Sequence, residues 1–290
     1  MARGVIATAR LDFHRQLVES RVLALREGAV TNADRASATS RRIAELLANR
    51  VCSNLGLKLE TPGVAGGTQG RLFAEYTKTY VQKTLDSIPS SVKGWTYVSG
   101  GSIDKYAQYA HLREIQRLVQ EYPELRLMIG GDYIIGPDVV VSRAPLSDSD
   151  LGDGVIADAD ELALSTFLRS SNKPALPILH ASVSCKWTLR SDRAQNARTE
   201  ALNLIRNRKG RVPVIAVVTA EPLPSRLASL ADGTGDVDRV YHIALNELTE
   251  AVNQVVADNA GLKDQKAALE RMVGGRRLAD ISDLPFDIAT

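Results

Sequence analysis

Cysteine is scarce in this chain of 290 residues, with only Cys52 and Cys185 present. They are far apart and in no spacing typical of metal ligands, which leaves the zinc-finger and disulfide-scaffold classes without support. Long apolar runs are also missing, since no stretch approaches the roughly 20 residues of a membrane span. The N-terminus, MARGVIATARLDFHRQL, lacks a secretory apolar core and a cleavage site. We therefore expect a cytoplasmic protein with free thiols and no membrane partner.

The chain also lacks a large excess of either charge. It has 36 Lys and Arg and 34 Asp and Glu, which gives a net charge of +2. Total charge therefore says little about partners. Locally the balance differs: residues 186–211 hold eight Lys and Arg but only two acidic residues. Such a concentration is typical of a polyanion site, and the alternative is a solvated helix face.

Hydrophobic residues make up 44% of the chain and charged residues 24%, which is ample for the core of a globular protein. There is no internal repeat and no convincing linker. Apolar patterns predict helices at 5–27, 36–51, 71–88, 104–122, 159–170, 193–208, 224–231, 246–259 and 262–273. Strands are predicted at 95–99, 139–141, 175–187, 212–220 and 240–245.

Strands and helices alternate in the second half, which indicates an α/β fold with a central mixed β-sheet flanked by helices. We expect one domain over 1–290. Its parts are a mainly helical N-terminal elaboration at 1–103, the core at 104–245, and C-terminal helices and a tail at 246–290. Turn-rich loops are expected at 61–70 and 144–158, and Asn32 or Asp34 could cap the second helix.

The first candidate active-site residue is Asp138, which follows Pro137. Pro137 cannot donate to a sheet ladder, so Asp138 should stand at the mouth of the following strand. Ser184 and Lys186 are two apart and share one face of their strand, while Cys185 points to the other. If they meet Asp138 at one sheet end, the carboxylate could hold a divalent cation. The lysine could stabilise the negative charge on a phosphate during the reaction. The alternative is a turn aspartate and a solvated lysine.

The residues that follow suit base recognition. Arg190, Asp192 and Arg193 stand at the start of a predicted helix, where Arg forks match guanine and Asp accepts from the cytosine amino group. A helix-capping Asp192 beside two surface arginines is the alternative. Glu200, 14 residues after Lys186, could reach back to the same sheet end, or could be an ordinary exposed glutamate.

The segment HASVSCKWTLRSDRAQNARTE strongly resembles the active-site segment of the NgoMIV-type restriction endonucleases. These enzymes belong to the PD-(D/E)xK nuclease superfamily and cut within GCCGGC. The likeness covers most of the chain from 104 on, and 1–103 thinly. It continues through LNLIRNRKGRVPVIAVVTAEPLPSR, GTG-x-VDRVYHIAL and RRLADISDLPFDIA, and upstream includes TNAD, YAQYAHL, YPEL and DYIIGPDVVV. A restriction-endonuclease-like core is implied.

The resemblance also implies catalytic roles. Asp138 would be the metal-binding aspartate and Lys186 the catalytic lysine of an SCK variant of the (D/E)xK motif. Ser184 stands where many members have a carboxylate, and Glu200 would take that place. Cys185 would offer its backbone carbonyl to the metal, so the ligand set is Asp138, Cys185 and Glu200.

The resemblance also implies which residues contact DNA. The inner CCGG would be read by Arg190, Asp192 and Arg193, and the outer G·C pair by Asp34 and Arg226. A family glutamine corresponds to Gln69, although the loop spacing differs. The family glutamate directly after a phenylalanine has no match, because Ala74 follows Phe73 and the glutamate is Glu75. Either the alignment slips by one and Glu75 is the catalytic residue, or that support is altered.

The activity implied is that of a type II restriction endonuclease. It would make Mg²⁺-dependent double-strand cuts at a CCGG-containing palindrome, with GCCGGC as the expected site, leaving 5′ overhangs and 5′-phosphates. A palindrome calls for a homodimer, and the resemblance implies its assembly into a homotetramer. A companion methyltransferase would act on the same site without stable binding. Two alternatives are a repair or structure-selective nuclease and a non-catalytic sequence-specific DNA-binding protein.

Overall fold

Six strands form one mixed sheet at the centre of the molecule. The computed structural model describes residues 4–89, 94–122, 124–125, 134–152, 154–156, 165–233 and 235–290. Each strand pairs with the next along the chain, antiparallel from β3 to β5 and parallel from β5 to β8. The strands are β3 (Trp95–Ser99), β4 (Val139–Arg143), β5 (Ile178–Lys186), β6 (Val214–Thr219), β7 (Arg239–His242) and β8 (Leu278–Asp280). The predicted mixed α/β sheet is therefore confirmed.

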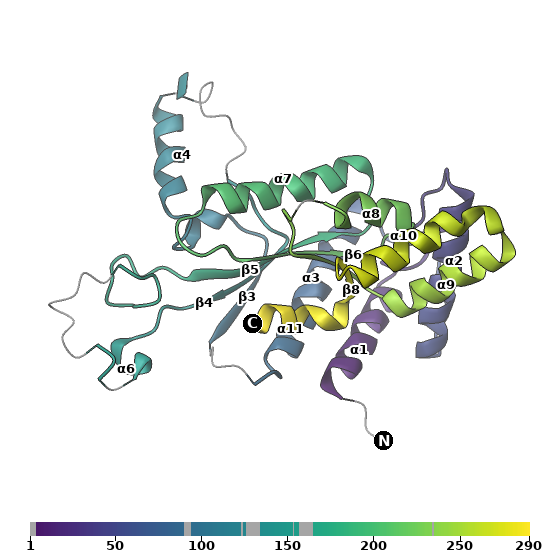
Figure 1. Ribbon diagram of the computed structural model, residues 1–290, viewed down its shortest axis with the longest axis horizontal. Coiled ribbons are helices and arrows are strands. Elements are labelled where there is room, and N and C mark those ends of the chain that lie inside the picture. Colours follow the sequence, from purple (N-terminus) through teal and green to yellow (C-terminus); the bar gives the residue numbers. More distant parts are fainter. Residues whose placement is uncertain are drawn as a thin grey trace.

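Helices cover both faces of this sheet (Figure 1). In that view α7 crosses above the strands, α3 and α11 lie below them, and α1, α2, α9 and α10 gather at one end. The helices are α1 (Val5–Glu19), α2 (Ala38–Leu55), α3 (Gly66–Leu85), α4 (His111–Glu121), α6 (Asp148–Leu151), α7 (Ser191–Asn207), α8 (Pro224–Ala231), α9 (Leu245–Asp258), α10 (Lys263–Gly274) and α11 (Leu284–Ala289). Single 3-10 turns are η1 (Ile103–Lys105), η3 (Ala260–Leu262) and η4 (Ile281–Asp283).

Burial on both faces explains the composition of the central strands. Val139, Val140 and Val141 of β4 are fully buried, and β5 is buried from Ala181 to Cys185. β-branched side chains fit such a two-sided setting, which is why these strands are continuous apolar runs rather than alternating ones. Helix α3 packs across β3, β4 and β5. The sheet edge that carries the candidate residues is thus held from below by α3.

The N-terminal helix is shorter than predicted. It ends at Glu19 rather than 27, because the chain turns through Arg21 at a positive φ of 62°. A small hairpin follows, β1 (Leu25–Arg26) with β2 (Ala29–Val30), joined by Glu27 and Gly28, both at positive φ. Two consecutive left-handed residues are what a tight hairpin requires, and this local turn overrides the apolar pattern.

Other boundaries also differ from the predictions. Helix α3 already begins at Gly66, inside the predicted loop 61–70, and α4 begins only at His111. Strand β8 was not predicted, because three residues are too few to show a period. The second helix is capped by Ser37, whose hydroxyl accepts from the Ser40 N–H at 3.2 Å, so the prediction of Asn32 or Asp34 as its cap is wrong.

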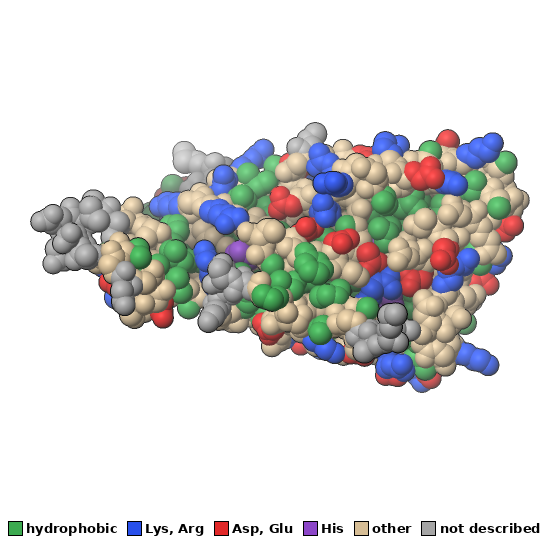
Figure 2. Space-filling view, turned by 60° about the horizontal axis from the view of Figure 1, so that its bottom comes forward, with side chains coloured by type: hydrophobic (Ala, Val, Ile, Leu, Met, Phe, Trp, Pro, Cys, Tyr) green, Lys and Arg blue, Asp and Glu red, His purple; other side chains and the backbone are tan. Residues whose placement is uncertain are grey.

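The helix predicted at 159–170 lies partly outside the described residues, and the described part, 165–170, forms turns instead. The division into parts at 1–103, 104–245 and 246–290 stays a prediction, although β3 and β8 from the outer parts join the central sheet. In the described part of the chain, every helix is too short or too polar to span a bilayer. The face drawn in Figure 2 mixes basic and acidic side chains around a central hydrophobic patch, as expected from the small net charge.

Candidate functional site

The predicted aspartate and lysine meet at one edge of the sheet. Strand β4 runs antiparallel to β5, with Val139 opposite Val183, so Asp138 falls beside the end of β5. Its Oδ2 accepts the backbone N–H of Cys185 at 2.7 Å and lies 3.4 Å from the Lys186 ammonium nitrogen. Because one carboxylate oxygen contacts both groups, the start of β4 and the end of β5 are tied together at this point.

Glu200 reaches the same edge from helix α7. Its Oε1 lies 3.3 Å from Lys186 Nζ, and its Oε2 accepts the Ser184 hydroxyl at 2.9 Å. The lysine therefore touches the carboxylates of Asp138 and Glu200 together. The structure brings these four side chains into one cluster, while their roles stay predictions.

The charge state of Lys186 follows from this setting. Its side chain is only 16% exposed, and burial alone would lower its pKa. The carboxylates of Asp138 and Glu200 outweigh burial and raise the pKa above its usual value. Lys186 is thus an ammonium at neutral pH, able to donate hydrogen bonds and to stabilise negative charge.

Cys185 turns its thiol away from the cluster, as the strand alternation predicts. The thiol contacts Thr77 of helix α3, and its pKa is raised, first by burial and then by the charge of Asp138. It is a free, buried cysteine. Its backbone, not its sulfur, is what it presents at the edge.

The donor set at this edge consists of oxygen atoms. Across the described ranges, no group of three or more His, Cys, Asp or Glu side chains is placed to hold a metal. Two carboxylates remain, from Asp138 and Glu200, with side chains 37% and 31% exposed, and the Cys185 carbonyl stays the predicted third oxygen. Carboxylates and a carbonyl, without sulfur or imidazole, fit a hard divalent cation that keeps some of its waters.

Glu75 of helix α3 lies beside the end of the neighbouring strand, β3. Its Oε2 accepts the Ser99 hydroxyl at 2.7 Å, and its Oε1 lies 2.6 Å from Lys78 Nζ. These two contacts lower its pKa. Ser99 pairs with Val139, and the following backbone N–H bonds to the Asp138 carbonyl. Glu75 therefore lies one strand away from Asp138, with its carboxylate already engaged.

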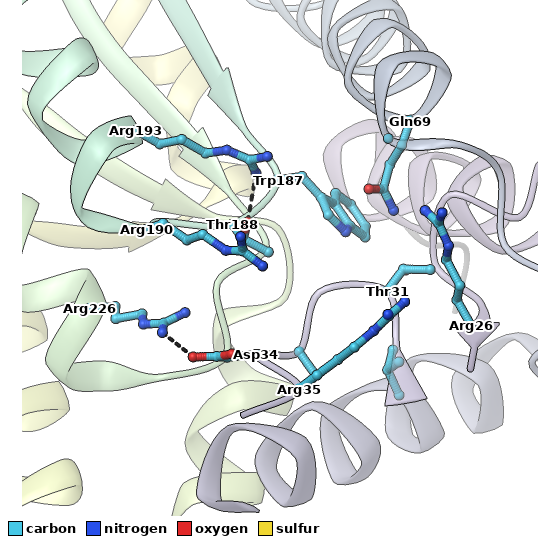
Figure 3. Close-up of a pocket in the computed structure, with 13 residues that line it drawn as sticks. Arg26, Thr31, Asp34, Arg35, Gln69, Trp187, Thr188, Arg190, Arg193 and Arg226 are labelled. Atoms are coloured by element: carbon cyan, nitrogen blue, oxygen red, sulfur yellow. Dashed lines mark hydrogen bonds and ion pairs between the residues drawn. The ribbon is translucent and has the colours of Figure 1, made fainter. Parts of the chain in front are cut away.

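A cavity of about 320 Å³ opens beside this cluster and collects most of the predicted DNA contacts (Figure 3). Trp187 and Thr188, which directly follow the lysine, form part of its wall. The predicted contacts that line it are Asp34, Gln69, Arg190, Arg193 and Arg226. In Figure 3 the side chains of Arg190, Arg193 and Arg226 extend from one side, and those of Gln69 and Arg26 from the other. Residues far apart in sequence thus face one space.

The cavity is strongly basic. Of the described residues that line it, five are arginines and one, Asp34, is acidic. Asp34 pairs with Arg226, and its pKa is lowered, first by the Ala36 backbone N–H and then by Arg226 and Arg190. Such a concave basic surface attracts and orients a polyanion.

Individual side chains in the cavity are held by local bonds. Arg193 donates to the Thr188 hydroxyl at 2.7 Å, and Gln69 donates to the Val22 carbonyl at 2.9 Å. Trp187 packs edge-on against Phe73 of α3 with ring centroids 5.0 Å apart. The cavity wall is therefore partly preorganised.

Asp192 is exposed in the first turn of α7 and is not among the described lining residues. The alternative that it caps this helix is wrong, because Arg190 holds the N-cap position and no side-chain cap bond is formed there. An acidic residue in the first turn still favours the helix dipole.

Sequence reasoning missed three charged residues of this region. Arg26 and Arg35 line the cavity and both lie near Glu27, the last residue of the helix predicted at 5–27. Glu221 is fully buried, bonds to the backbone of Leu189 and lies 4.0 Å from the lining residue Arg226. Its position directly after an uncharged strand, at the edge where the other candidates lie, was a usable signal.

Comparison with known proteins points to one family. The model of the family described as "NgoMIV restriction enzyme" matches residues 13–290. The type II restriction enzyme NgoMIV of Neisseria gonorrhoeae is 41% identical over 287 residues, covering 97% of each chain. A solved structure, the restriction endonuclease PspGI–substrate DNA complex, aligns over 98% of this chain and 92% of that one at 14% identity. Its TM-score of 0.27 is too low to bear on the fold.

Proposed function

The chain belongs to the NgoMIV restriction enzyme family and is a type II restriction endonuclease, and from this premise we propose that it cuts both strands of GCCGGC, in the presence of Mg²⁺. The cuts leave 5′ overhangs with 5′-phosphates. One observation carries the proposal: a cavity lined by five arginines adjoins the cluster of Asp138, Lys186 and Glu200.

Each residue of the cluster has a separate task in this proposal. Asp138, Glu200 and the Cys185 carbonyl hold the metal, and Ser184 orients the Glu200 carboxylate by its hydrogen bond. Mg²⁺, when bound, supplies a Lewis acid that makes its water a better nucleophile and offsets phosphate charge. Lys186 donates hydrogen bonds to the attacking water and to the charge that grows on the phosphorus oxygens.

The reaction is a hydrolysis. The water oxygen forms a bond to phosphorus and gives up a proton as the bond from phosphorus to the 3′-oxygen breaks, and the 3′-oxygen takes up a proton from solvent and leaves as a hydroxyl. Glu75, beside Ser99 on the neighbouring strand, is assigned a supporting catalytic role at the same edge. Its ties to Ser99 and Lys78 suit a residue that positions others.

Base recognition is assigned to the cavity side. Arg190, Asp192 and Arg193 read the inner CCGG in the major groove, and Asp34 with Arg226 reads the outer G·C pair. Gln69 supplies a further contact at that outer pair. Arginine forks match guanine and carboxylates match the cytosine amino group, so this set fits a site made only of G·C pairs.

A palindromic target requires two copies of the active site. We assign the chain to a homodimer that assembles into a homotetramer, cytoplasmic and working alongside a methyltransferase that protects the same sequence. A repair nuclease or a DNA-binding protein without activity is less well supported. A repair nuclease would not need a base-recognition cavity lined by arginines. A DNA-binding protein without activity would not need the cluster of Asp138, Lys186 and Glu200.

Cleavage of two unmethylated plasmids, carrying one or two GCCGGC sites, tests the proposal with and without Mg²⁺. Sequenced ends with a four-base CCGG 5′ overhang, formed only with Mg²⁺ and faster on the two-site plasmid, are expected. Cuts at other sequences would contradict the assignment of Asp34, Gln69 and Arg226. Specific binding without any cut would instead support the non-catalytic alternative.

A further inference from the structure

Glu221 is a buried acid to which the proposed reaction gives no task. It comes two residues after the end of strand β6, is 0% exposed, and lies behind the basic cavity rather than among its lining residues. A buried carboxylate is costly unless it is well bonded, and an apolar side chain usually serves a core better. Its presence here therefore asks for a reason beyond packing.

The two carboxylate oxygens of Glu221 bond to two different segments. Oε2 accepts the Leu189 N–H at 2.8 Å, and Oε1 accepts the Leu223 N–H at 3.1 Å. Leu189 immediately precedes Arg190, and Leu223 is the N-cap of helix α8, which carries Arg226. Glu221 thus links the backbone next to Arg190, which is assigned to the inner base pairs, with the backbone that leads into the helix of Arg226, which is assigned to the outer pair.

Further bonds at the same strand end reinforce this junction. Oε2 of Glu221 also lies 4.0 Å from the Arg226 guanidinium. The preceding residue, Ala220, accepts the buried Asn32 side chain at 2.8 Å, and Asn32 is two residues before Asp34. Ala220 also donates its N–H to the Trp187 carbonyl at 3.3 Å. Three segments that contribute to the cavity are therefore hydrogen-bonded to Ala220 and Glu221, just after the end of β6.

We propose that Glu221 is a positioning residue for base recognition, which holds the start of α7 and the start of α8 in one relative placement so that the inner and outer readers engage DNA together. This inference rests on the proposed function of the cavity. Neither helix start has a side-chain cap bond of its own. The shared carboxylate supplies what the local sequences lack.

A pH dependence follows from this geometry. Burial raises the pKa of Glu221 to about 7, against the lowering effect of the Leu189 and Leu223 N–H groups and of Arg226. The charged groups facing it are Arg226 from α8 and Asp34 from the segment before α2. An ionised carboxylate accepts on both oxygens, while a protonated one turns one oxygen into a donor. The junction is therefore tighter above pH 7 than below it.

The test compares cleavage of GCCGGC with cleavage of two altered palindromes, ACCGGT for the outer pair and GCATGC for the inner pairs. For each, the ratio of kcat/KM values measures discrimination and cancels the chemistry common to all sites. Glu221→Gln keeps the shape but replaces one acceptor oxygen by a donor. We expect both ratios to fall by about tenfold or more at a pH of about 8.

The matched control is Glu247→Gln, another buried glutamate, which bonds to Arg10 and Asn54 instead. It should alter stability but leave both discrimination ratios as in the wild type. Wild-type ratios should also fall between about pH 8 and about pH 6, while those of Glu221→Gln stay flat. The wild-type half of this measurement needs no variant, and wild-type ratios that do not change with pH would contradict the inference even if Glu221→Gln fails to fold.

Unchanged ratios in Glu221→Gln, an equal loss of rate on all three sequences, or pH-independent wild-type ratios would each overturn the inference. They would leave the proposed function standing as long as the wild type prefers GCCGGC. A wild type that shows no such preference would overturn the proposed function itself, so the two failures are distinguishable.

Discussion

The hydroxyl of Ser184 on strand β5 donates to Oε2 of Glu200 on helix α7 at 2.9 Å, across 16 positions of sequence. In the proposed active site, this contact gives the Ser-x-Lys strand the carboxylate that its own sequence lacks. The acid comes from the following helix, and the serine takes part by orienting it.

The first prediction concerns that contact. Ser184→Ala should lower the single-turnover cleavage rate by about 10- to 100-fold, because an unoriented ligand weakens a metal site by that amount. Glu200→Gln should cost more, since it removes a charge from the site. Ser182→Ala, a buried serine two residues back on the same strand, is the matched control. An effect of Ser182→Ala as large as that of Ser184→Ala would mean that packing, not orientation, is responsible.

Asp138→Asn separates cleavage from binding. Asparagine keeps an oxygen that can accept the Cys185 N–H, so the strand junction should survive, but the negative charge is lost. Cleavage should fall at least about a hundredfold, while binding to a GCCGGC duplex, measured by fluorescence anisotropy, should remain. Loss of binding together with cleavage would show that Asp138 has a structural role.

Arg193→Ala tests inner base recognition. If the fork reads a guanine, specific binding should weaken by roughly 1–3 kcal/mol and discrimination at the inner pairs should relax. The control is Arg206→Ala, an exposed arginine in the last turn of the same helix. A loss that is the same on every sequence would make Arg193 a phosphate contact instead.

The pair of Arg226 and Asp34 tests outer base recognition. Arg226→Ala should relax discrimination at the outer G·C pair by roughly 1–3 kcal/mol and leave that at the inner pairs largely intact. Asp34→Asn should act at the same position, because the two side chains are bonded to each other. Competition binding with GCCGGC and ACCGGT duplexes gives the comparison. Additive effects of the two changes would show that the pair does not act as a unit.

Stability should depend on pH through Glu221. Its pKa is raised from 4.5 unfolded to about 7 folded, because burial penalises the ionised form. The fold therefore holds the proton more tightly, and this contribution to stability is fully present below about pH 4.5 and is lost as the pH rises through about 7, although the ionised carboxylate is the better acceptor for the two backbone N–H groups. The free energy of unfolding of the wild type, relative to Glu221→Gln, should therefore fall over this window by an amount on the order of 3 kcal/mol. Urea unfolding at a series of pH values measures it. Curves that run parallel would mean that Glu221 does not titrate in the fold.

Much of the fold was predictable because strong local patterns survive packing. Helix α8 begins and ends as predicted, and β5, β6, α9 and α10 lie within a few residues of their predicted bounds. Each has a clear apolar period or an uncharged apolar run. The failures are local turns and short elements, such as the hairpin at Leu25–Val30, where left-handed residues decide the path and hydrophobicity does not.

The sequence by itself determined which residues are the candidates for the chemistry. Asp138 and Lys186 follow from a strand that starts after proline and from a Ser-x-Lys alternation, and the family follows from a long matching segment. Such signals are local, because a strand's alternation and a helix's first turn depend on neighbouring residues alone.

Only the tertiary structure decided which of these residues meet. The antiparallel pairing of β4 with β5 brings Asp138 to Lys186, and α7 folds back to add Glu200. The same packing closes a cavity from segments near residues 30, 69, 190 and 226, and buries Glu221 behind it. These contacts join distant parts of the chain through sheet register and helix packing, and a linear pattern does not contain such distances.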